Sequence, residues 1–371
     1  MEILAEYSGG VQSGGSESAS LGIYTKSASA CSEGGRASAR VMRYALQSEA
    51  RGLVPTERVA VCMRVPRGTV EVMRGLGTGA FYRGLCVCGS VWGCPVCASR
   101  VSERRALELG SAVAQYRAQG GRVLVAAYTV RHWCSDRLWE LVDAVVAARR
   151  RMRSGRASAG LREMVVGTVR SFEVTWGEEN GWHPHLHELV FVRDGCRVGD
   201  VGRALRESWS SAVEGVWRRG NEHSVEVQVG DAAAARYVSK VGGWDGVREV
   251  VKGVSKSGRH GRLSPLGLLY GSMMGDCSLG SLWQEYYWVF RGRRMLVWSR
   301  GLREALGLGV DVSDEELAEA DGDVASVVLA SLTREQWRVI LANDARAEVL
   351  EAAEGGYEAL RAFLGQLGVV L

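Results

Sequence analysis

The chain has 371 residues, which is enough for two or three domains with substantial cores. A hydrophobic content of 46% and a charged content of 24% are ordinary for a soluble globular protein and exclude a chain that is disordered throughout. There is no apolar run long enough to span a membrane and no secretory signal, so we expect a cytoplasmic protein. The net charge of +4 permits nucleic-acid binding but does not predict it.

The amino-acid composition and the hydrophobic pattern of the chain change near residue 40. Residues 1–40 are rich in Gly, Ser and Ala and carry little hydrophobic pattern, which predicts a disordered or loosely ordered N-terminus. Between residues 41 and 85, short apolar runs such as VAVCMRV and VEVMRGL alternate with Arg, Pro and Gly. This pattern favours strands over helices in that segment.

Four of the nine cysteines fall within CVCGSVWGCPVC, residues 86–97. In a chain without an export signal, such crowding favours a metal over disulfides. Cys94 and Cys97 form a C-x-x-C pair with Cys88 shortly before it, and the fourth ligand would be Cys62 or Cys86. Four thiolates fill a tetrahedral site, so a bound Zn²⁺ would be structural. A redox dithiol is the alternative interpretation of the C-x-x-C pair.

Helices and strands are expected to alternate through the middle of the chain. The apolar spacing predicts helices over 98–118, 138–153, 198–218 and 232–241, and strands over 122–130 and 224–229. Asp231 stands where it could cap the last of these helices. Tyr237 and Lys240, three residues apart in AARYVSKV, would share one face of that helix.

Residues 172–192, FEVTWGEENGWHPHLHELVFV, predict a β-hairpin and hold three of the six histidines. Alternate residues of a strand share a face, so His183, His185 and His187 can point the same way. Glu173, on the preceding strand, could bring a carboxylate to them. Two or three imidazoles and one carboxylate suit a divalent metal with open coordination positions, as catalysis requires. Glu173 and His183 are rivals for the third ligand.

Two arginine clusters predict a surface that binds DNA phosphates. Their members are Arg149, Arg150, Arg151, Arg153 and Arg156 in the first, and Arg291, Arg293, Arg294, Arg300 and Arg303 in the second. A solvated arginine face is the alternative for either cluster, and arginines at the end of a helix also suit its dipole. The stretch 311–323 is mostly acidic.

These motifs resemble one known family. HPHLH resembles the His-hydrophobic-His signature of the HUH endonucleases, and GWHPHLH is similar to its version in plasmid rolling-circle replication initiators, the Rep proteins. The CGSVW–CPVC stretch, the strand ending in Thr129 and His132, and YVSK at 237–240 stand in the family's order. The likeness spans roughly residue 59 to the C-terminus. His132 could contact the site, or it could have a capping or packing role.

The resemblance implies an α+β fold. An HUH-like nicking domain over 119–300, with a central antiparallel sheet and flanking helices, would follow a zinc-binding module and helix at 41–118. An acidic α-rich region would occupy 301–371. The family also favours Cys62 over Cys86 as the fourth zinc ligand, because a cysteine in that place recurs ahead of the CGSVW–CPVC stretch.

The resemblance further implies a site-specific single-strand DNA endonuclease and strand transferase that initiates plasmid replication in the bacterial cytoplasm. Tyr237 would attack the scissile phosphate and keep the 5′ phosphate, while Lys240 would offset developing charge. His185 and His187, with Glu173 or His183, would hold Mg²⁺ or Mn²⁺. The expected partners are double-strand origin DNA, the nicked single strand, and a host helicase and polymerase.

One position departs from the family. Some relatives carry a Glu four residues before the tyrosine, where this chain has Ala233, and Asp231 or Glu249 could substitute for it. Two other functions remain compatible with the sequence. The first is an HUH transposase acting on the ends of a mobile element, and the second is a zinc-stabilised DNA-binding repressor without catalysis.

Overall fold

The computed structural model describes residues 37–75, 79–154, 158–217, 224–230, 262–320 and 325–371. The expectations for residues 1–36 and for the helix at 232–241 lie outside these ranges. Within them the chain is a mixed α+β protein with two antiparallel sheets, as the sequence predicted for its class. None of the helices in the described ranges is both long and apolar enough to cross a membrane.

The larger sheet contains the histidine hairpin. Its strands, in spatial order β6-β3-β5-β4-β7, are β6 (Val225–Val229), β3 (Arg122–Tyr128), β5 (Gly181–Val192), β4 (Val165–Gly177) and β7 (Val297–Trp298). All neighbouring strands are antiparallel. The predicted hairpin is therefore present as β4 and β5, and β5 is the central strand, flanked by β3 and β4.

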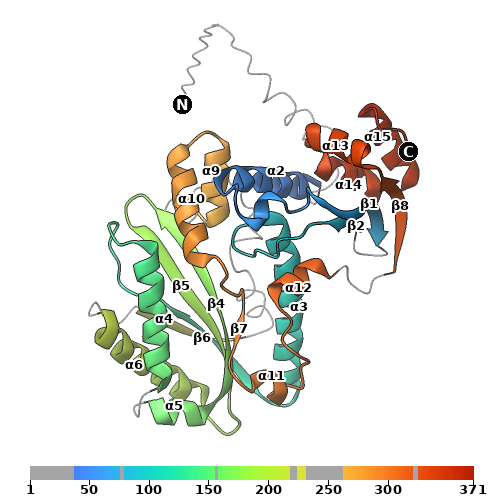
Figure 1. Ribbon diagram of the computed structural model, residues 1–371. Helices are drawn as coiled ribbons and strands as arrows, with labels where there is room; N and C mark the ends of the chain where they lie inside the picture. The colour runs from blue at the N-terminus through green and yellow to red at the C-terminus, as the bar shows by residue number, and fades with distance from the viewer. Residues whose placement is uncertain (1–36, 76–78, 155–157, 218–223, 231–261, 321–324) are drawn as a thin grey trace, which may run out of the picture.

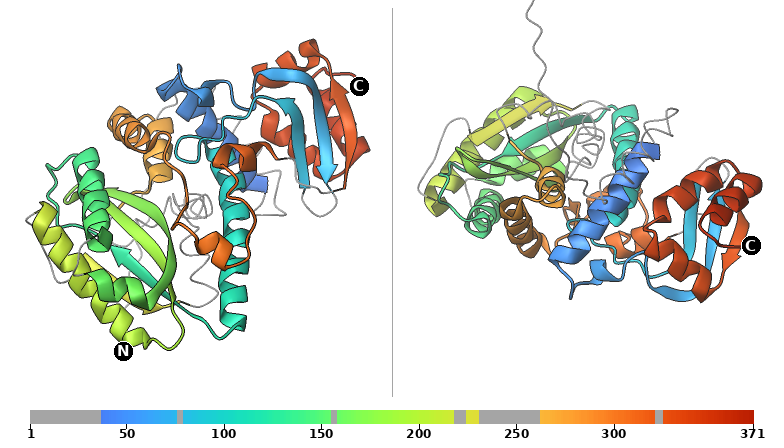
Figure 2. Two further views of the ribbon diagram at one scale, coloured as in Figure 1. Left: turned by 60° about the horizontal axis from the view of Figure 1, so that its bottom comes forward. Right: turned by 90° about the horizontal axis from the view of Figure 1, so that it is seen from above.

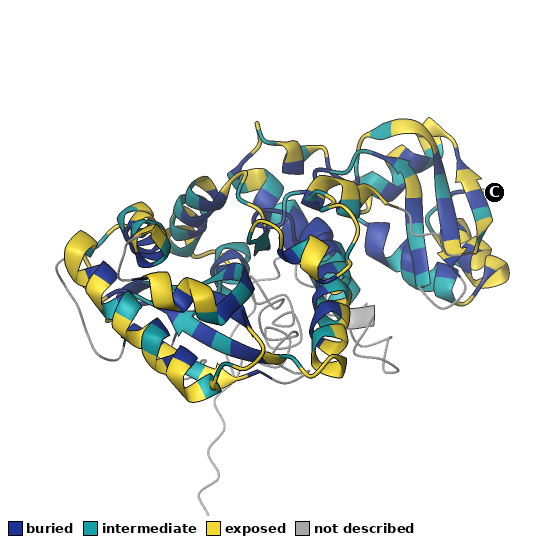
Figure 3. Ribbon diagram, turned by 90° about the horizontal axis from the view of Figure 1, so that it is seen from below, coloured by how far each residue is buried: buried dark blue, intermediate teal, exposed yellow. Residues whose placement is uncertain are grey.

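Three helices lie on one side of this sheet (Figure 1). They are α4 (Leu138–Ser154), α5 (Ala159–Met164) and α6 (Val198–Trp217). In α4 the buried residues Leu141, Val145 and Met152 follow helical spacing, which gives the helix an apolar face toward the sheet. The ring of Trp209 on α6 packs against Tyr128 of β3, with centroids 4.7 Å apart. In Figure 3 the exposed residues follow the outer sides of these helices.

The smaller sheet joins the two ends of the described chain. Its strands, in spatial order β2-β1-β8, are β2 (Gly79–Leu85), β1 (Pro66–Gly75) and β8 (Ser326–Leu332). Helices α13 (Arg334–Ala342), α14 (Arg346–Glu354) and α15 (Tyr357–Gln366) follow β8. The rings of Tyr82 on β2 and Trp337 on α13 meet edge to face at 5.1 Å. The segment after residue 301 is thus largely helical but also contributes an edge strand beside β1.

The two sheets lie at opposite ends of the molecule with helices between them (Figures 1 and 2). The intervening elements are α2 (Ala37–Leu53), η1 (Arg58–Ala60), α3 (Pro95–Ala118), α9 (Pro265–Met273), α10 (Cys277–Phe290), α11 (Leu302–Ala305) and α12 (Asp314–Glu319). A continuous set of buried apolar side chains runs through this middle region and both sheets.

The prediction of strands throughout 41–85 is wrong in its first half. Residues up to Leu53 belong to α2, where Leu46 and Ala50 are buried one helical turn apart. The run VAVCMRV is also not a strand, because it forms η1 followed by turns. Met63 there has a φ of 53°, a left-handed conformation that ends extended structure. Strands begin only at Pro66.

Candidate functional site

Four buried cysteines meet at one point. The sulfur atoms of Cys62, Cys88, Cys94 and Cys97 all lie within 4.8 Å of one another. The Cys62–Cys97, Cys88–Cys97 and Cys62–Cys94 sulfur distances are 3.5, 3.6 and 3.8 Å. A tetrahedral zinc with bonds of about 2.3 Å places its ligand sulfurs about 3.8 Å apart, so these residues fit Zn²⁺. The predicted cluster is confirmed with Cys62 as its fourth member, whereas Cys86 lies outside it.

The local structure buries all four thiols and favours the charged form of one of them, Cys94. Cys94 precedes Pro95, the first residue of α3, and Cys97 follows in the first turn of that helix. The amide of Gln47 donates to the Cys94 sulfur at 3.1 Å. Burial alone would raise the pKa of Cys94, but hydrogen bonds from the neighbouring cysteines hold it well below its usual range. A metal bound by these four buried sulfurs would have no open coordination position, so its role would be structural.

The three histidines of β5 stand in a row on one face of the larger sheet. The ring centroids of His183 and His185 are 4.1 Å apart, and those of His185 and His187 are 5.9 Å apart. Glu173 on β4 is the register partner of His185, and its carboxylate accepts from His187 Nε2 at 2.7 Å. The structure therefore places all four residues that the sequence put forward for a divalent metal along one face of the hairpin. Among the described residues, a converged group of metal ligands is found for the four cysteines and not for this row.

The opposite face of β5 is fastened to helix α4 by a buried ion pair. Arg149 and Glu188 are only 6% and 0% exposed, and Arg149 Nε donates to Glu188 Oε1 at 3.0 Å. Tyr128 also donates to this carboxylate, at 3.2 Å. Because successive strand residues alternate between faces, the histidines lie on the face away from α4 and α6. The expectation that Arg149 binds DNA is corrected, since its guanidinium is inside the protein.

Two rings of the row, those of His183 and His185, have lowered pKa values, which favour the neutral form that binds a metal. Burial lowers the pKa of His183, and the nearby rings of His185 and His132 lower it further. Burial and the neighbouring His187 lower the pKa of His185 to about 4. A neutral imidazole offers a lone pair to a metal, whereas a protonated one cannot.

His132 enters the site from the loop that follows β3. Its Nδ1 lies 3.1 Å from the carbonyl oxygen of Asn180, which can only accept, so Nδ1 carries the proton and donates. Its Nε2 must then accept from Nδ1 of His183. This arrangement leaves the lone pair of His183 on Nε2. Of the two expectations for His132, contact with the site is the one that the geometry supports.

Arg262 is a site residue that sequence reasoning missed. Its charge contributes to the lowered pKa values of His132, His183 and His185, which places the guanidinium near the row. The adjoining Leu263 exchanges two backbone hydrogen bonds with Trp176 on β4, of 2.7 and 2.9 Å, and so fixes this segment beside the hairpin. Local sequence patterns could not connect it with the histidines, because Arg262 stands more than 70 positions after them.

The other arginines of the two clusters occupy different settings. Arg150 and Arg151 are exposed and Arg153 is half-buried at the end of α4, while Arg156 lies outside the described residues. In the second cluster Arg291, Arg293 and Arg294 pair with Glu57, Asp143 and Asp311, respectively, at 2.9, 3.7 and 2.6 Å. Exposed Arg150 and Arg151 are therefore better placed to meet a phosphate than Arg291, Arg293 and Arg294, whose charges already have carboxylate partners.

The expected nucleophile Tyr237 and its neighbour Lys240 lie outside the described residues. Tyr286 and Tyr287, two other tyrosines, are buried in α10, and burial raises the pKa of both. The Tyr287 hydroxyl donates to Glu57 at 2.9 Å. Both side chains belong to the core, which settles their role as packing and makes them poor nucleophiles.

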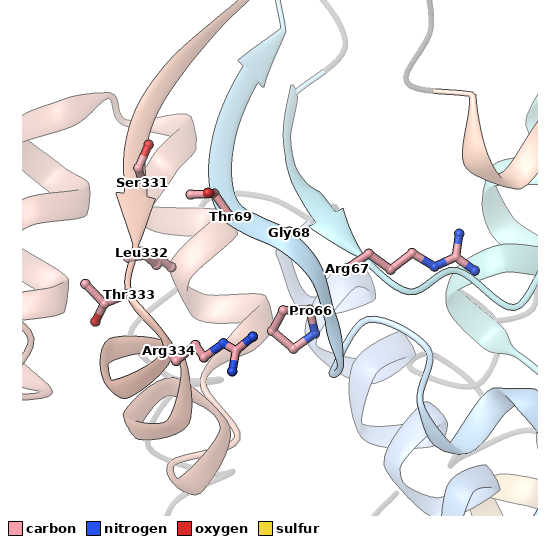
Figure 4. A pocket seen from close by; sticks show the side chains of 8 residues that line it. All are labelled: Pro66, Arg67, Gly68, Thr69, Ser331, Leu332, Thr333 and Arg334. Carbon is pink, nitrogen blue, oxygen red and sulfur yellow. The ribbon is translucent and has the colours of Figure 1, made fainter.

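A pocket of about 530 Å³ lies at the smaller sheet, between the start of β1 and the end of β8 (Figure 4). Its walls are formed by Pro66, Arg67, Gly68, Thr69, Ser331, Leu332, Thr333 and Arg334. None of the candidate metal ligands, all of which are described residues, lines it. Arg67 already pairs with Glu319 at 3.1 Å.

Comparison with known proteins gives an independent view of the chain. Residues 85–330 match a family described as replication protein. A protein named "Protein rep" from Streptomyces lividans is 30% identical over 78% of this chain and 79% of its own length. The "Neomycin resistance protein" from Streptomyces cyanogenus is 33% identical over 34% of this chain and 35% of its own length. No solved structure matches significantly. The matched range contains the histidine row and three of the four clustered cysteines.

Proposed function

Because the chain belongs to the replication protein family that residues 85–330 match, we propose that it initiates rolling-circle replication of a plasmid by nicking one origin strand. The observation that carries the proposal is the row of His183, His185 and His187 with Glu173 beside it. Imidazoles and a carboxylate on one strand pair are donors of the kind that bind a divalent metal. Packing alone gives no reason for such a concentration of polar rings in a central strand.

His185 and His187 would hold Mg²⁺ or Mn²⁺, with Glu173 as the third ligand that the register supports and His183 as its rival. When bound, the metal would polarise the scissile phosphate as a Lewis acid. Arg262 adds a fixed positive charge near these residues, which would attract the phosphate and stabilise the charge that develops on it. The ion pair of Arg149 with Glu188 holds the strand against α4, so the row keeps its geometry.

In the proposed reaction the hydroxyl oxygen of Tyr237 attacks the phosphorus, and the bond from phosphorus to the 3′ oxygen breaks. The 5′ phosphate stays on the tyrosine and the released 3′-OH serves as the primer. Covalent catalysis of this kind splits strand transfer into two steps, and a second attack releases or seals the strand. YVSK at 237–240 supports this role, and Lys240 would add a second cation. Double-strand origin DNA, a host helicase and a polymerase in the bacterial cytoplasm are the partners that such a reaction needs.

The test uses supercoiled plasmid that carries the cognate origin. We expect full-length protein with Mn²⁺ or Mg²⁺ to relax it by a single nick, and EDTA to stop the reaction. Glu173→Ala should lose at least about 100-fold in rate, since removal of one stabilising group commonly costs that much. Glu179→Ala, in the exposed turn of the same hairpin, is the matched control and should nick normally.

The alternatives are separate outcomes of the same assay. Protein that shifts origin DNA in a gel yet never nicks it, with any metal, would be a repressor. Protein that cleaves only the ends of a mobile element would be a transposase. Either outcome would overturn the proposal.

A further inference from the structure

The loop after β3 presents an indole ring to solvent. Trp133 is 50% exposed, although tryptophan is one of the largest apolar side chains. The guanidinium carbon of Arg131 lies 4.8 Å from the centre of its ring, over one face. The two side chains therefore form an aromatic and cationic pair at the surface.

This loop is held in place by hydrogen bonds to helix α6. Trp209 Nε1 donates to the carbonyl of Thr129 at 3.2 Å, and Trp217 Nε1 donates to that of Arg131 at 2.8 Å. The backbone N–H of Trp133 donates to the carboxylate of Asp136 at 2.8 Å. The exposed indole is thus carried by a backbone that is fixed on both sides, which reduces the entropy lost when a ligand binds it.

The hairpin also packs tightly against this loop. Gly181, at the start of β5, has a φ of 68°, and a Cβ there would lie 2.9 Å from the backbone of Cys134. Only glycine allows so close an approach in this conformation. The loop and the histidine strand are therefore in direct contact.

The Arg131–Trp133 pair borders the histidine row. His132, the residue between them, bonds to His183, and the two ring centroids are 4.7 Å apart. Consecutive Cα atoms are about 3.8 Å apart. The Cα of Trp133 is therefore that far from the Cα of His132, whose side chain lies within the candidate metal site.

We propose that Arg131 and Trp133 form a stacking platform for an unpaired base of the cleaved strand, next to the scissile phosphate. The identity of the strand rests on the proposed function. Each base has a π-face that an indole can stack on, and the arginine can contact the adjoining phosphate. Tryptophan and arginine also recur at protein interfaces, but the contact of this loop with the histidine row favours DNA.

The test measures binding without cleavage. Full-length protein that carries Tyr237→Phe is titrated against fluorescent oligo(dT) of about twenty nucleotides, and anisotropy is recorded at several salt concentrations. Trp133→Ala should weaken binding about tenfold, the loss expected for one stacked base, with an unchanged salt slope. Arg131→Gln should instead lower the slope by about 0.7, the value for one phosphate contact on a single strand.

Two variants separate stacking from folding. Trp133→Phe keeps an aromatic face and should bind nearly as well as its parent, whereas Trp133→Leu keeps apolar bulk without that face and should bind as weakly as Trp133→Ala. Trp139→Ala removes an equally exposed indole, at 52%, from α4 and should leave the affinity unchanged. Zinc content and the thermal midpoint should match the parent in every variant.

Defined results overturn the platform. It is wrong if Trp133→Ala and Trp133→Leu bind oligo(dT) like the parent, or if Trp139→Ala loses as much affinity as they do. The proposed function has its own readout, because nicking of the origin plasmid by protein with Tyr237 intact does not enter this measurement. A chain that shows the Trp133 dependence but never nicks would retain a stacking platform for single-stranded DNA, while the proposed function and the identity of that strand as the cleaved one would be lost.

Discussion

The buried pair of Arg149 and Glu188 gives a prediction with a large magnitude. Arg149→Met removes the cation of the pair. The carboxylate of Glu188, which is 0% exposed, then lacks that ionic partner. Breaking a buried ion pair on one side costs about 3–5 kcal/mol, because the remaining charge has lost its water and its partner. The bond from Arg149 to Thr168 at 3.3 Å is lost as well. We therefore expect the free energy of unfolding to fall by about 4 kcal/mol.

The double variant Arg149→Met with Glu188→Leu is the matched control. It replaces both charges by apolar groups of similar volume, so most of the lost stability should return. Urea unfolding followed by tryptophan fluorescence measures all three proteins. A loss below about 1 kcal/mol in Arg149→Met, the range of a surface pair, would refute the reasoning.

The same pair sets a pH dependence. Burial alone would raise the pKa of Glu188, but the charge of Arg149 and its hydrogen bonds hold it below the ordinary value. A carboxyl whose pKa is lowered on folding stabilises the protein fully above its unfolded pKa, about 4.3, and loses that contribution as the pH falls through the folded value. The stability gap between the parent and Glu188→Gln should therefore persist at pH 7 and shrink below about pH 4.

Three further results are expected. Cys62→Ser should lower the bound zinc well below about one per chain and reduce soluble yield, while Cys86→Ser keeps the metal, as elemental analysis will show. Equal zinc in both would contradict the cluster. Arg262→Gln should slow nicking about 100-fold with unchanged zinc content. The control Arg203→Gln, on the exposed side of α6, should nick at the parental rate. Equal nicking rates in the two variants would show that Arg262 is not part of the site. His185→Ala should abolish Mn²⁺ binding seen by calorimetry, and an unchanged isotherm would place the metal elsewhere.

The parts of the site that depend on the two-residue repeat of a β-strand, or on closely spaced cysteines, were predictable from the sequence. His183, His185 and His187 share a face because a strand repeats every two residues, and a hairpin brings Glu173 opposite them. The cysteine cluster was predictable in three of its members from C-x-x-C spacing, but Cys62 needed the family resemblance. Cys62 lies in a turn after η1, where a strand was expected. An apolar run does not distinguish between these two conformations.

Other parts depended on contacts between distant segments. Arg149 lies four residues after Val145 and three before Met152, so it belongs to the buried face of α4. Grouping it with the neighbouring arginines as one basic cluster hid this position. A closer reading of helical spacing would have placed it inside. Arg262 and the pairing of β8 with β1 join segments far apart in the sequence, and local patterns carry no information on such contacts.

The central claim is that this chain cuts DNA through Tyr237, and the covalent intermediate tests it directly. Protein is incubated with Mn²⁺ and an origin oligonucleotide labelled on the 3′ side of the cut, denatured, digested and mapped by mass spectrometry. The account predicts a 5′-phosphotyrosyl nucleotide on the peptide that contains Tyr237, and none in Tyr237→Phe. An adduct that forms at the parental rate in Tyr237→Phe, or maps to another tyrosine, would contradict it.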